Sequence, residues 1–87
     1  MEKRIGSALI LIQDNSEVSH LNEILSRHAN IIIGRQGIPM RERGISLISL
    51  VLEGSTDEIG ALTGQIGRLK GMEIKSVLTR YKEPYDN

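Results

Sequence analysis

Four short segments of the chain are rich in aliphatic residues and are separated by turn formers or by helical patterns, which predicts four β-strands. Residues 4–13 are rich in aliphatic side chains and are followed by the turn formers Asp14 and Asn15. Residues 30–38 and 45–53 are two further apolar runs joined by a short turn segment, which predicts a hairpin. Gly44 suits the left-handed position that closes a three-residue hairpin loop, because glycine has no Cβ to clash. Residues 72–80 alternate between two sets of side chains, Met72, Ile74, Ser76 and Leu78 against Glu73, Lys75, Val77 and Thr79, and form the last predicted strand.

Two other segments repeat apolar residues at steps of three and four, which is typical of amphipathic helices. The first helix begins at a cap provided by Asn15 or Ser16. The second begins with the capping-box spacing of Ser55 and Glu58, and Gly71 ends it. The apolar stripes are Val18, Leu21, Leu25 and His28 in the first helix, and Ile59, Leu62, Ile66 and Leu69 in the second.

The resulting order is β-α-β-β-α-β, which predicts an α+β, ferredoxin-like sandwich. In this fold a four-stranded antiparallel sheet carries both helices on one face. A chain of 87 residues has enough apolar surface for one core. We therefore expect a single domain over residues 1–81 and a polar C-terminal tail over residues 82–87.

The first and third predicted strands occupy the middle of such a sheet, and both are apolar on both faces. Two helices cover only one face, so the other would expose an apolar patch of several hundred Å². We expect a second copy to cover it, giving a homo-oligomer, either a dimer or a tetramer. The alternative is a single sheet that tolerates scattered aliphatic residues. The expected interface residues on the strands are Ile5, Leu9, Leu11, Ile45, Leu47 and Val51.

Glycines form a second unusual stripe, on the far side of the second predicted helix from its apolar stripe. Gly60, Gly64 and Gly67 each cost a helix up to about 1 kcal/mol relative to alanine. Close approach of a neighbouring backbone would explain this cost, and on that ground Gly60 and Gly64 join the expected interface. A weak helix that tolerates glycine is the other interpretation.

Composition argues against several classes of protein. Eleven Lys and Arg residues balance eleven Asp and Glu residues, and Tyr81 and Tyr85 are the only aromatic residues, so direct nucleic-acid binding is not expected. The absence of cysteine excludes disulfides and iron–sulfur ligation, and fits a reducing cytoplasm. No apolar run is long enough to span a bilayer, so we expect a cytoplasmic protein without membrane contact.

The sequence shows no catalytic constellation. It has no convincing pairing of a nucleophile with a base, no pair of carboxylates in distinct environments and no phosphate-binding loop, so we expect a protein that is not an enzyme and needs no cofactor. His20 and His28 are about 12 Å apart along one predicted helix and cannot share a metal within one chain. His28 is expected to bond free carbonyls at the helix end. Metal ligation across an oligomer interface remains the alternative.

Two regions are candidates for binding a small anionic ligand. Backbone N–H groups at the junction of the first strand and first helix could hold a carboxylate, with simple helix capping as the alternative. Arginines also flank the predicted hairpin, where a solvated charged surface with Glu42 as a local partner is the alternative. The candidate ligand-binding residues are Asp14, Asn15, Ser16, Arg35, Gly37 and Arg41.

Two stretches carry a family resemblance. Residues 35–42 read R-x-G-x-P-x-R-E, and residues 59–67 read IGALTGQIG. With residues 48–52 and 71–77, they closely resemble the iron-only hydrogenase system regulators, over nearly the whole chain and most strongly over residues 33–77. The resemblance implies an ACT-like fold, similar to the C-terminal domain of the nickel-responsive repressor. It also implies a role in transcription regulation in anaerobic bacteria that make iron-only hydrogenase.

The chain departs from these relatives in two respects. It has no histidine in a predicted strand and no residues for a DNA-binding domain, both of which the nickel-responsive repressor has. Residues 14–18 also lack the glycine that amino-acid-binding ACT domains carry in this loop. We therefore expect a small oligomeric regulatory or sensor module that binds a small ligand or a protein partner. A metal-sensing or metal-handling module with ligands at an oligomer interface is the alternative.

Overall fold

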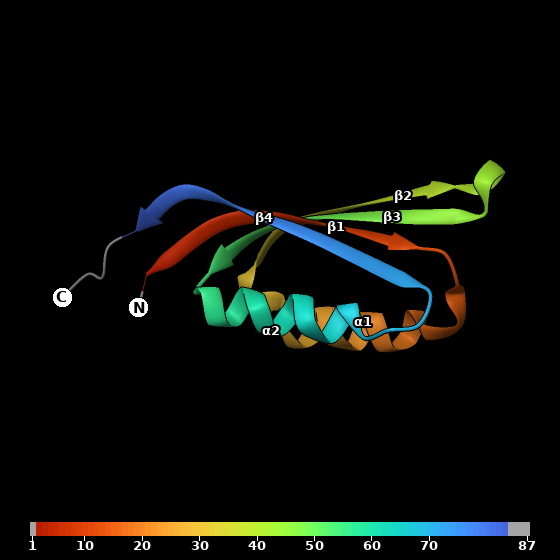
Figure 1. Ribbon diagram of the computed structural model, residues 1–87, viewed down its shortest axis with the longest axis horizontal. Coiled ribbons are helices and arrows are strands. Elements are labelled where there is room, and N and C mark those ends of the chain that lie inside the picture. Colours follow the sequence, from red (N-terminus) through yellow and green to blue (C-terminus); the bar gives the residue numbers. More distant parts are fainter. Residues whose placement is uncertain (1, 84–87) are drawn as a thin grey trace.

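The computed structural model describes residues 2–83 and shows one sheet covered by two helices on one face (Figure 1). The strands pair antiparallel in the order β2-β3-β1-β4. This arrangement confirms the predicted ferredoxin-like βαββαβ sandwich. The strands and helices are β1 (Lys3–Ile12), α1 (Val18–Arg27), β2 (Ile32–Met40), β3 (Ile45–Gly54), α2 (Thr56–Gly67) and β4 (Met72–Glu83). Short 3-10 turns occupy Asn15–Glu17, Ala29–Ile31 and Arg41–Arg43.

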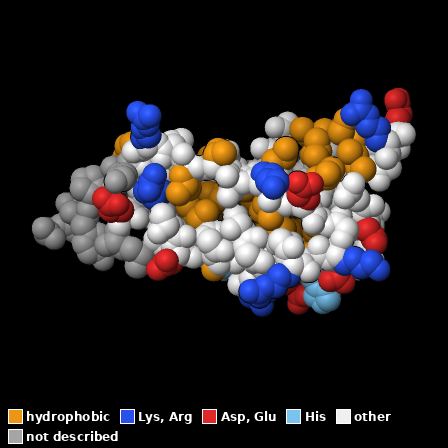
Figure 2. Space-filling view, viewed as in Figure 1, with side chains coloured by type: hydrophobic (Ala, Val, Ile, Leu, Met, Phe, Trp, Pro, Cys, Tyr) orange, Lys and Arg blue, Asp and Glu red, His pale blue; other side chains and the backbone are white. Residues whose placement is uncertain are grey.

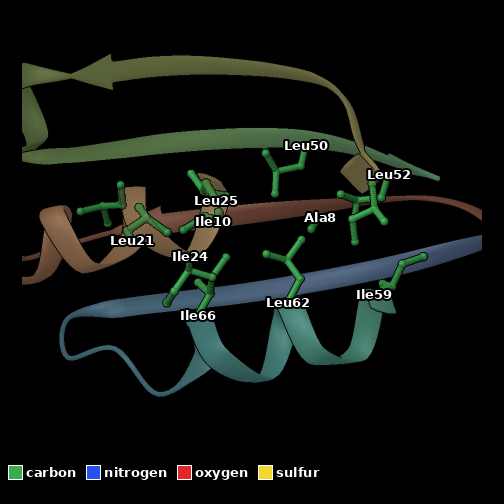
Figure 3. Close-up of a cluster of buried hydrophobic side chains, with 12 residues drawn as sticks. Ala8, Ile10, Leu21, Ile24, Leu25, Leu50, Leu52, Ile59, Leu62 and Ile66 are labelled. Carbon is green, nitrogen blue, oxygen red and sulfur yellow. The ribbon is translucent and has the colours of Figure 1, made fainter. Parts of the chain in front are cut away.

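The core lies between the sheet and the helices, on one of the two apolar faces of β1 and β3. The register places Ala8 beside Leu50 and Ile10 beside Ile48, all facing the helices. Figure 3 shows α1 and α2 pointing their own apolar stripes at these strands. Burying each such aliphatic side chain contributes about 1.5–3 kcal/mol. The buried apolar residues are Ala8, Ile10, Ile12, Leu21, Ile24, Leu25, Ile31, Leu50, Leu52, Ile59, Leu62 and Ile66.

The start of α2 agrees with the sequence, whereas its end does not. Ser55 Oγ accepts the backbone N–H of Glu58 at 3.1 Å, and a Glu58 carboxylate oxygen accepts the backbone N–H of Ser55 at 2.8 Å, completing the predicted capping box. The helix ends at Gly67 rather than Gly71. Leu69 leaves the helix but still packs against the core.

Two further boundaries differ from those predicted. Gly44 is left-handed (φ 68°), as expected, but the hairpin loop contains four residues because Met40 still pairs with Ile45. The last strand continues to Glu83, past the predicted end at residue 80. The first two residues of the predicted tail are therefore strand, and residues 84–87 lie outside the described residues.

The predicted caps of the first helix were wrong. Asp14 is the capping residue, and its Oδ1 accepts the backbone N–H of Ser16 at 2.9 Å. This bond closes the 3-10 turn Asn15–Glu17, and α1 begins only after it, with no side-chain cap of its own. Asp14 can do this because its backbone is extended, with φ −143° and ψ 126°.

Asp14 also lies at a contact between two loops. The loop before β4 passes the end of β1, and the Gln13 N–H donates to the Gly71 carbonyl at 2.8 Å. Gly71 has φ 74°, and a Cβ at this position would overlap the Cβ of Asp14. Gly71 is thus required both by its backbone conformation and by the close approach of Asp14.

We predict that Gly71→Ala lowers the free energy of unfolding by about 1–3 kcal/mol, because the variant strains the left-handed backbone and displaces Asp14. Gly37→Ala is the matched control. Gly37 does not have a positive φ, and a Cβ there would meet no atom within 4 Å. Urea unfolding of both variants tests this, and equal stabilities would contradict the loop contact.

The same loop predicts a pH effect. The backbone N–H and the side chain of Ser16 bond the Asp14 carboxylate and lower its pKa below the ordinary 3.8, with a smaller contribution from the Lys70 charge. Because the folded state has the lower pKa, this contribution to stability is present above pH 4 and is lost as pH falls through the folded pKa. We expect a carboxyl NMR titration to place Asp14 below 3.8, and Asp14→Asn to remove this part of the acid dependence. An Asp14 pKa at or above 3.8 would contradict the cap.

Candidate functional site

The sheet face that the helices leave uncovered is the most extensive candidate surface. In β1 and β3 the residues between the core positions point to this side, as the antiparallel register requires. Leu9 is 48 % exposed and Val51 43 %. We call this surface the open face. Its apolar residues are Ile5, Leu9 and Leu11 on β1, Ile45, Leu47 and Val51 on β3, Ile38 and Met40 on β2, and Val77 on β4.

Part of the open face lies on an arm that projects beyond the helices. The paired ends of β2 and β3, residues 39–45, extend past the end of β1 and past α1 and α2, with the turn at Arg41–Arg43 as the tip (Figure 1). Figure 2 shows apolar side chains gathered at this end of the sheet. A two-stranded ribbon is at best marginally stable in water, so an arm with one apolar face favours a contact that covers it.

Charged residues of the open face lie towards its margins. Glu73 and Lys75 on β4 face this side and form an ion pair at 4.0 Å, and Glu53 lies near the end of β3. The middle of the face, formed by β1, β3 and the arm, carries aliphatic side chains with a few uncharged polar ones. An apolar centre with a charged margin is the usual layout of a protein–protein interface.

All six strand residues predicted for the interface lie on the open face, so their predicted orientation is correct. Their use as an interface remains a prediction. The two glycines lie on α2, on the opposite side of the sheet, so one contact cannot include both groups. Gly60 and Gly64 are exposed, and a Cβ at either would meet no described atom within 4 Å. Packing within the described protomer therefore does not explain why these positions are glycine.

The candidate anion-binding residues do not converge. Asp14, Asn15 and Ser16 lie where β1 meets α1, and the Asp14 carboxylate itself takes the Ser16 N–H. Arg35 and Gly37 lie on β2, whereas Arg41 begins the turn at the tip of the arm. Binding at any of them stays a prediction, and the structure divides them among three places.

Arg35 lines a pocket that the sequence did not predict. Its neighbour across the ladder is Leu50, a core residue, so its side chain is on the helix side of β2. There it borders a pocket of about 280 Å³ between β2 and α1, with Leu25, Ala29 and Ile33 among the apolar lining residues. One sequence signal was present, because three consecutive isoleucines at residues 31–33 cannot alternate in a regular strand.

The two histidines are on α1, on the helix side of the sheet. His20 Nδ1 lies 3.1 Å from Glu17 Oε2 on the exposed surface. His28 Nε2 lies 3.4 Å from the side-chain oxygen of Gln65 on α2, so its side chain does not cap α1 as predicted. Within residues 2–83 no three His, Asp or Glu side chains are grouped to hold a metal. An oligomer formed through the open face would leave both histidines on its outer surface.

Within the described part of the chain, no helix has the length and apolarity needed to cross a membrane.

Comparisons with known proteins agree with this fold. Residues 4–76 match the TM1266-like family, described as "Iron-only hydrogenase system regulator, putative". No curated protein matches the chain. Among solved structures, the uncharacterized protein TM1266 from Thermotoga maritima is similar with a TM-score of 0.84 and 34 % identity, over 90 % of this chain and 99 % of that one.

Two more distant structures share the fold alone. An unknown protein from Galdieria sulphuraria has a TM-score of 0.60 at 11 % identity, over 94 % of this chain and 48 % of that one. The apo form of CPII from Thiomonas intermedia K12, a nitrogen regulatory PII-like protein, has a TM-score of 0.52 at 13 % identity, over 94 % of this chain and 95 % of that one. The family match, which spans most of the chain, places this protein in the TM1266-like family of iron-only hydrogenase system regulators.

Proposed function

We propose that this protein is a small regulatory module of an iron-only hydrogenase system that works as a homo-oligomer and binds a small ligand or a protein partner. It acts by binding rather than by catalysis, in the cytoplasm. Family membership supports the link to hydrogenase, and the apolar open face is the observation that carries the oligomer.

The size of the open face is adequate for a stable dimer. Four strands about 4.8 Å apart and ten residues long at about 3.3 Å per residue give roughly 600 Å² of flat sheet. Because side chains project from the sheet, its accessible surface area is larger than this flat area. Standard interfaces bury about 800 Å² of accessible surface per partner. A two-fold contact uses the same patch on both copies, so an apolar face meets an apolar face.

The second proposed contact is along α2. Gly60 and Gly64 leave a flat strip on which a neighbouring backbone can approach closely, and this strip faces away from the open face. A contact on each side of the protomer would extend the assembly from a dimer to a tetramer. The two glycines each cost the helix up to about 1 kcal/mol, which such a contact would offset.

We predict that Val51→Glu dissociates the oligomer, because it places a carboxylate in the apolar middle of the interface without a partner. Asn22→Glu is the matched control, since it adds the same charge at an exposed position of α1. Light scattering after size exclusion should show an oligomer for the natural protein and the control, and a monomer for Val51→Glu. A natural protein that is monomeric at micromolar concentration would disprove the interface.

The regulatory role predicts a change in hydrogenase expression. Deleting the gene in a host that makes iron-only hydrogenase should alter the level of hydrogenase transcript, or of matured enzyme where control acts after transcription. Wild type and Asn22→Glu should restore the natural level, whereas Val51→Glu should not. Unchanged transcript and enzyme activity in the deletion strain would contradict the proposed function and leave the oligomer unaffected.

A further inference from the structure

The outer edge of β2 is a second unpartnered feature, distinct from the open face. β2 pairs only with β3, so one side of the strand faces away from the sheet. Within residues 2–83, residues 34–38 form no hydrogen bond outside their ladder with β3. Such an edge presents a row of N–H and C=O groups on which another strand can pair.

A bulge at the start of β2 brings an apolar pocket to this edge. Ile32 pairs with Leu52 and Gly34 with Val51, so Ile33 is an extra residue that opposes nothing. Ile33 is 57 % exposed and borders the pocket of about 280 Å³ between β2 and α1. A strand added along β2 would therefore pass an apolar pocket of the size that one or two aliphatic side chains fill.

The charges at this edge are mostly positive. β2 and the turn that follows it contain Arg35, Arg41 and Arg43 but a single acidic residue, Glu42. Within the described residues the ion pairs are Glu17–His20 and Glu73–Lys75, so no described carboxylate lies within 4.0 Å of these three guanidinium groups. Arg35 lies at the rim of the pocket, where a guanidinium can bond a carboxylate in two places.

These charges argue against a second copy on the β2 edge. Pairing β2 with β2 would offer Arg35 no carboxylate, because Arg35 is the one charged residue of β2. Pairing β2 with β4 is little better, because residues 72–81 of β4 contain two basic residues, Lys75 and Arg80, against one acidic one, Glu73. An acidic segment of a different chain would supply the opposite charge.

We propose that the β2 edge binds an extended acidic segment of a partner protein by strand addition. The segment pairs with residues 34–38, places an aliphatic side chain in the pocket beside Ile33 and an acidic side chain on Arg35. This inference rests on the proposed regulatory function and names the chemistry of the protein partner. A dimer formed through the open face leaves the edge free, so both contacts can exist together.

The pocket and Arg35 lie on the same side of β2, so the valine and the charged residue must be two positions apart in the added strand. The test uses two fluorescein-labelled, amidated octapeptides as probes, one with the repeat Val-Thr-Glu-Thr and one with the repeat Val-Thr-Lys-Thr. Fluorescence polarisation should show binding of the glutamate peptide in preference to the lysine peptide. Arg35→Glu should weaken that binding at least about tenfold, the loss expected for a charge-assisted bond. Arg80→Glu, the same substitution at an exposed position of β4 on the opposite edge of the sheet, should leave it within about twofold. Failure of the glutamate peptide to bind, or an equal loss in both variants, would overturn the proposal.

Two further measurements locate the contact and separate it from the oligomer. Hydrogen exchange with the glutamate peptide should protect amides of residues 34–38 and not those of residues 72–78 on the other edge. Light scattering should show the same assembly for Arg35→Glu as for the natural protein, and a smaller assembly would mean that the edge belongs to a second copy. Val51→Glu should still bind the peptide, so that loss of the oligomer and loss of the edge site are distinguishable.

Discussion

One constraint governs this structure: the two central strands are apolar on both faces, but the chain has only two helices, enough to cover one of them. On the helix side, Ile10 and Leu50 are fully buried beneath α1 and α2. On the other side, Leu9 and Val51 of the same strands remain in solvent. The hydrophobic contribution on the second side becomes available only when another surface covers it. The protomer therefore forms every strand and helix of its fold but leaves one apolar face of the sheet uncovered.

Local sequence patterns predicted most of the fold, because successive side chains in a strand point to opposite faces of the sheet. Once Ala8 and Ile10 are placed in the core, Leu9 and Leu11 must point the other way. The capping box of α2 could also be predicted from the sequence, because Ser55 and Glu58 are three residues apart. These features depend on contacts between residues that are close in sequence or on the same strand.

Features set by distant residues were not predictable in this way. Asp14, Asn15 and Ser16 can each cap a helix, and their local sequence does not show that Asp14 packs against Gly71, more than fifty residues later. Gly71 was therefore assigned to the end of α2, although its left-handed backbone serves the contact with Asp14 and the helix ends earlier. The pocket at Arg35 escaped prediction for the same reason, because it requires a bulge in β2 and the placement of α1 beside it.

The open face and the β2 edge have different chemistry, which argues for different occupants. The open face is largely uncharged and can match itself about a two-fold axis, whereas the edge carries Arg35, which pairs with no described carboxylate and finds none on the β2 of another copy. β2 belongs to both surfaces, because the Ile38 side chain lies on the open face and the backbone N–H and C=O groups of the same strand line the edge. A strand added at the edge would restrict the projecting arm, and a second copy on the arm would restrict the edge. Once one contact has ordered the arm, the other contact loses less conformational entropy when it forms. Each contact would therefore raise the affinity of the other by the same factor. In this way the protomer would couple partner binding to assembly.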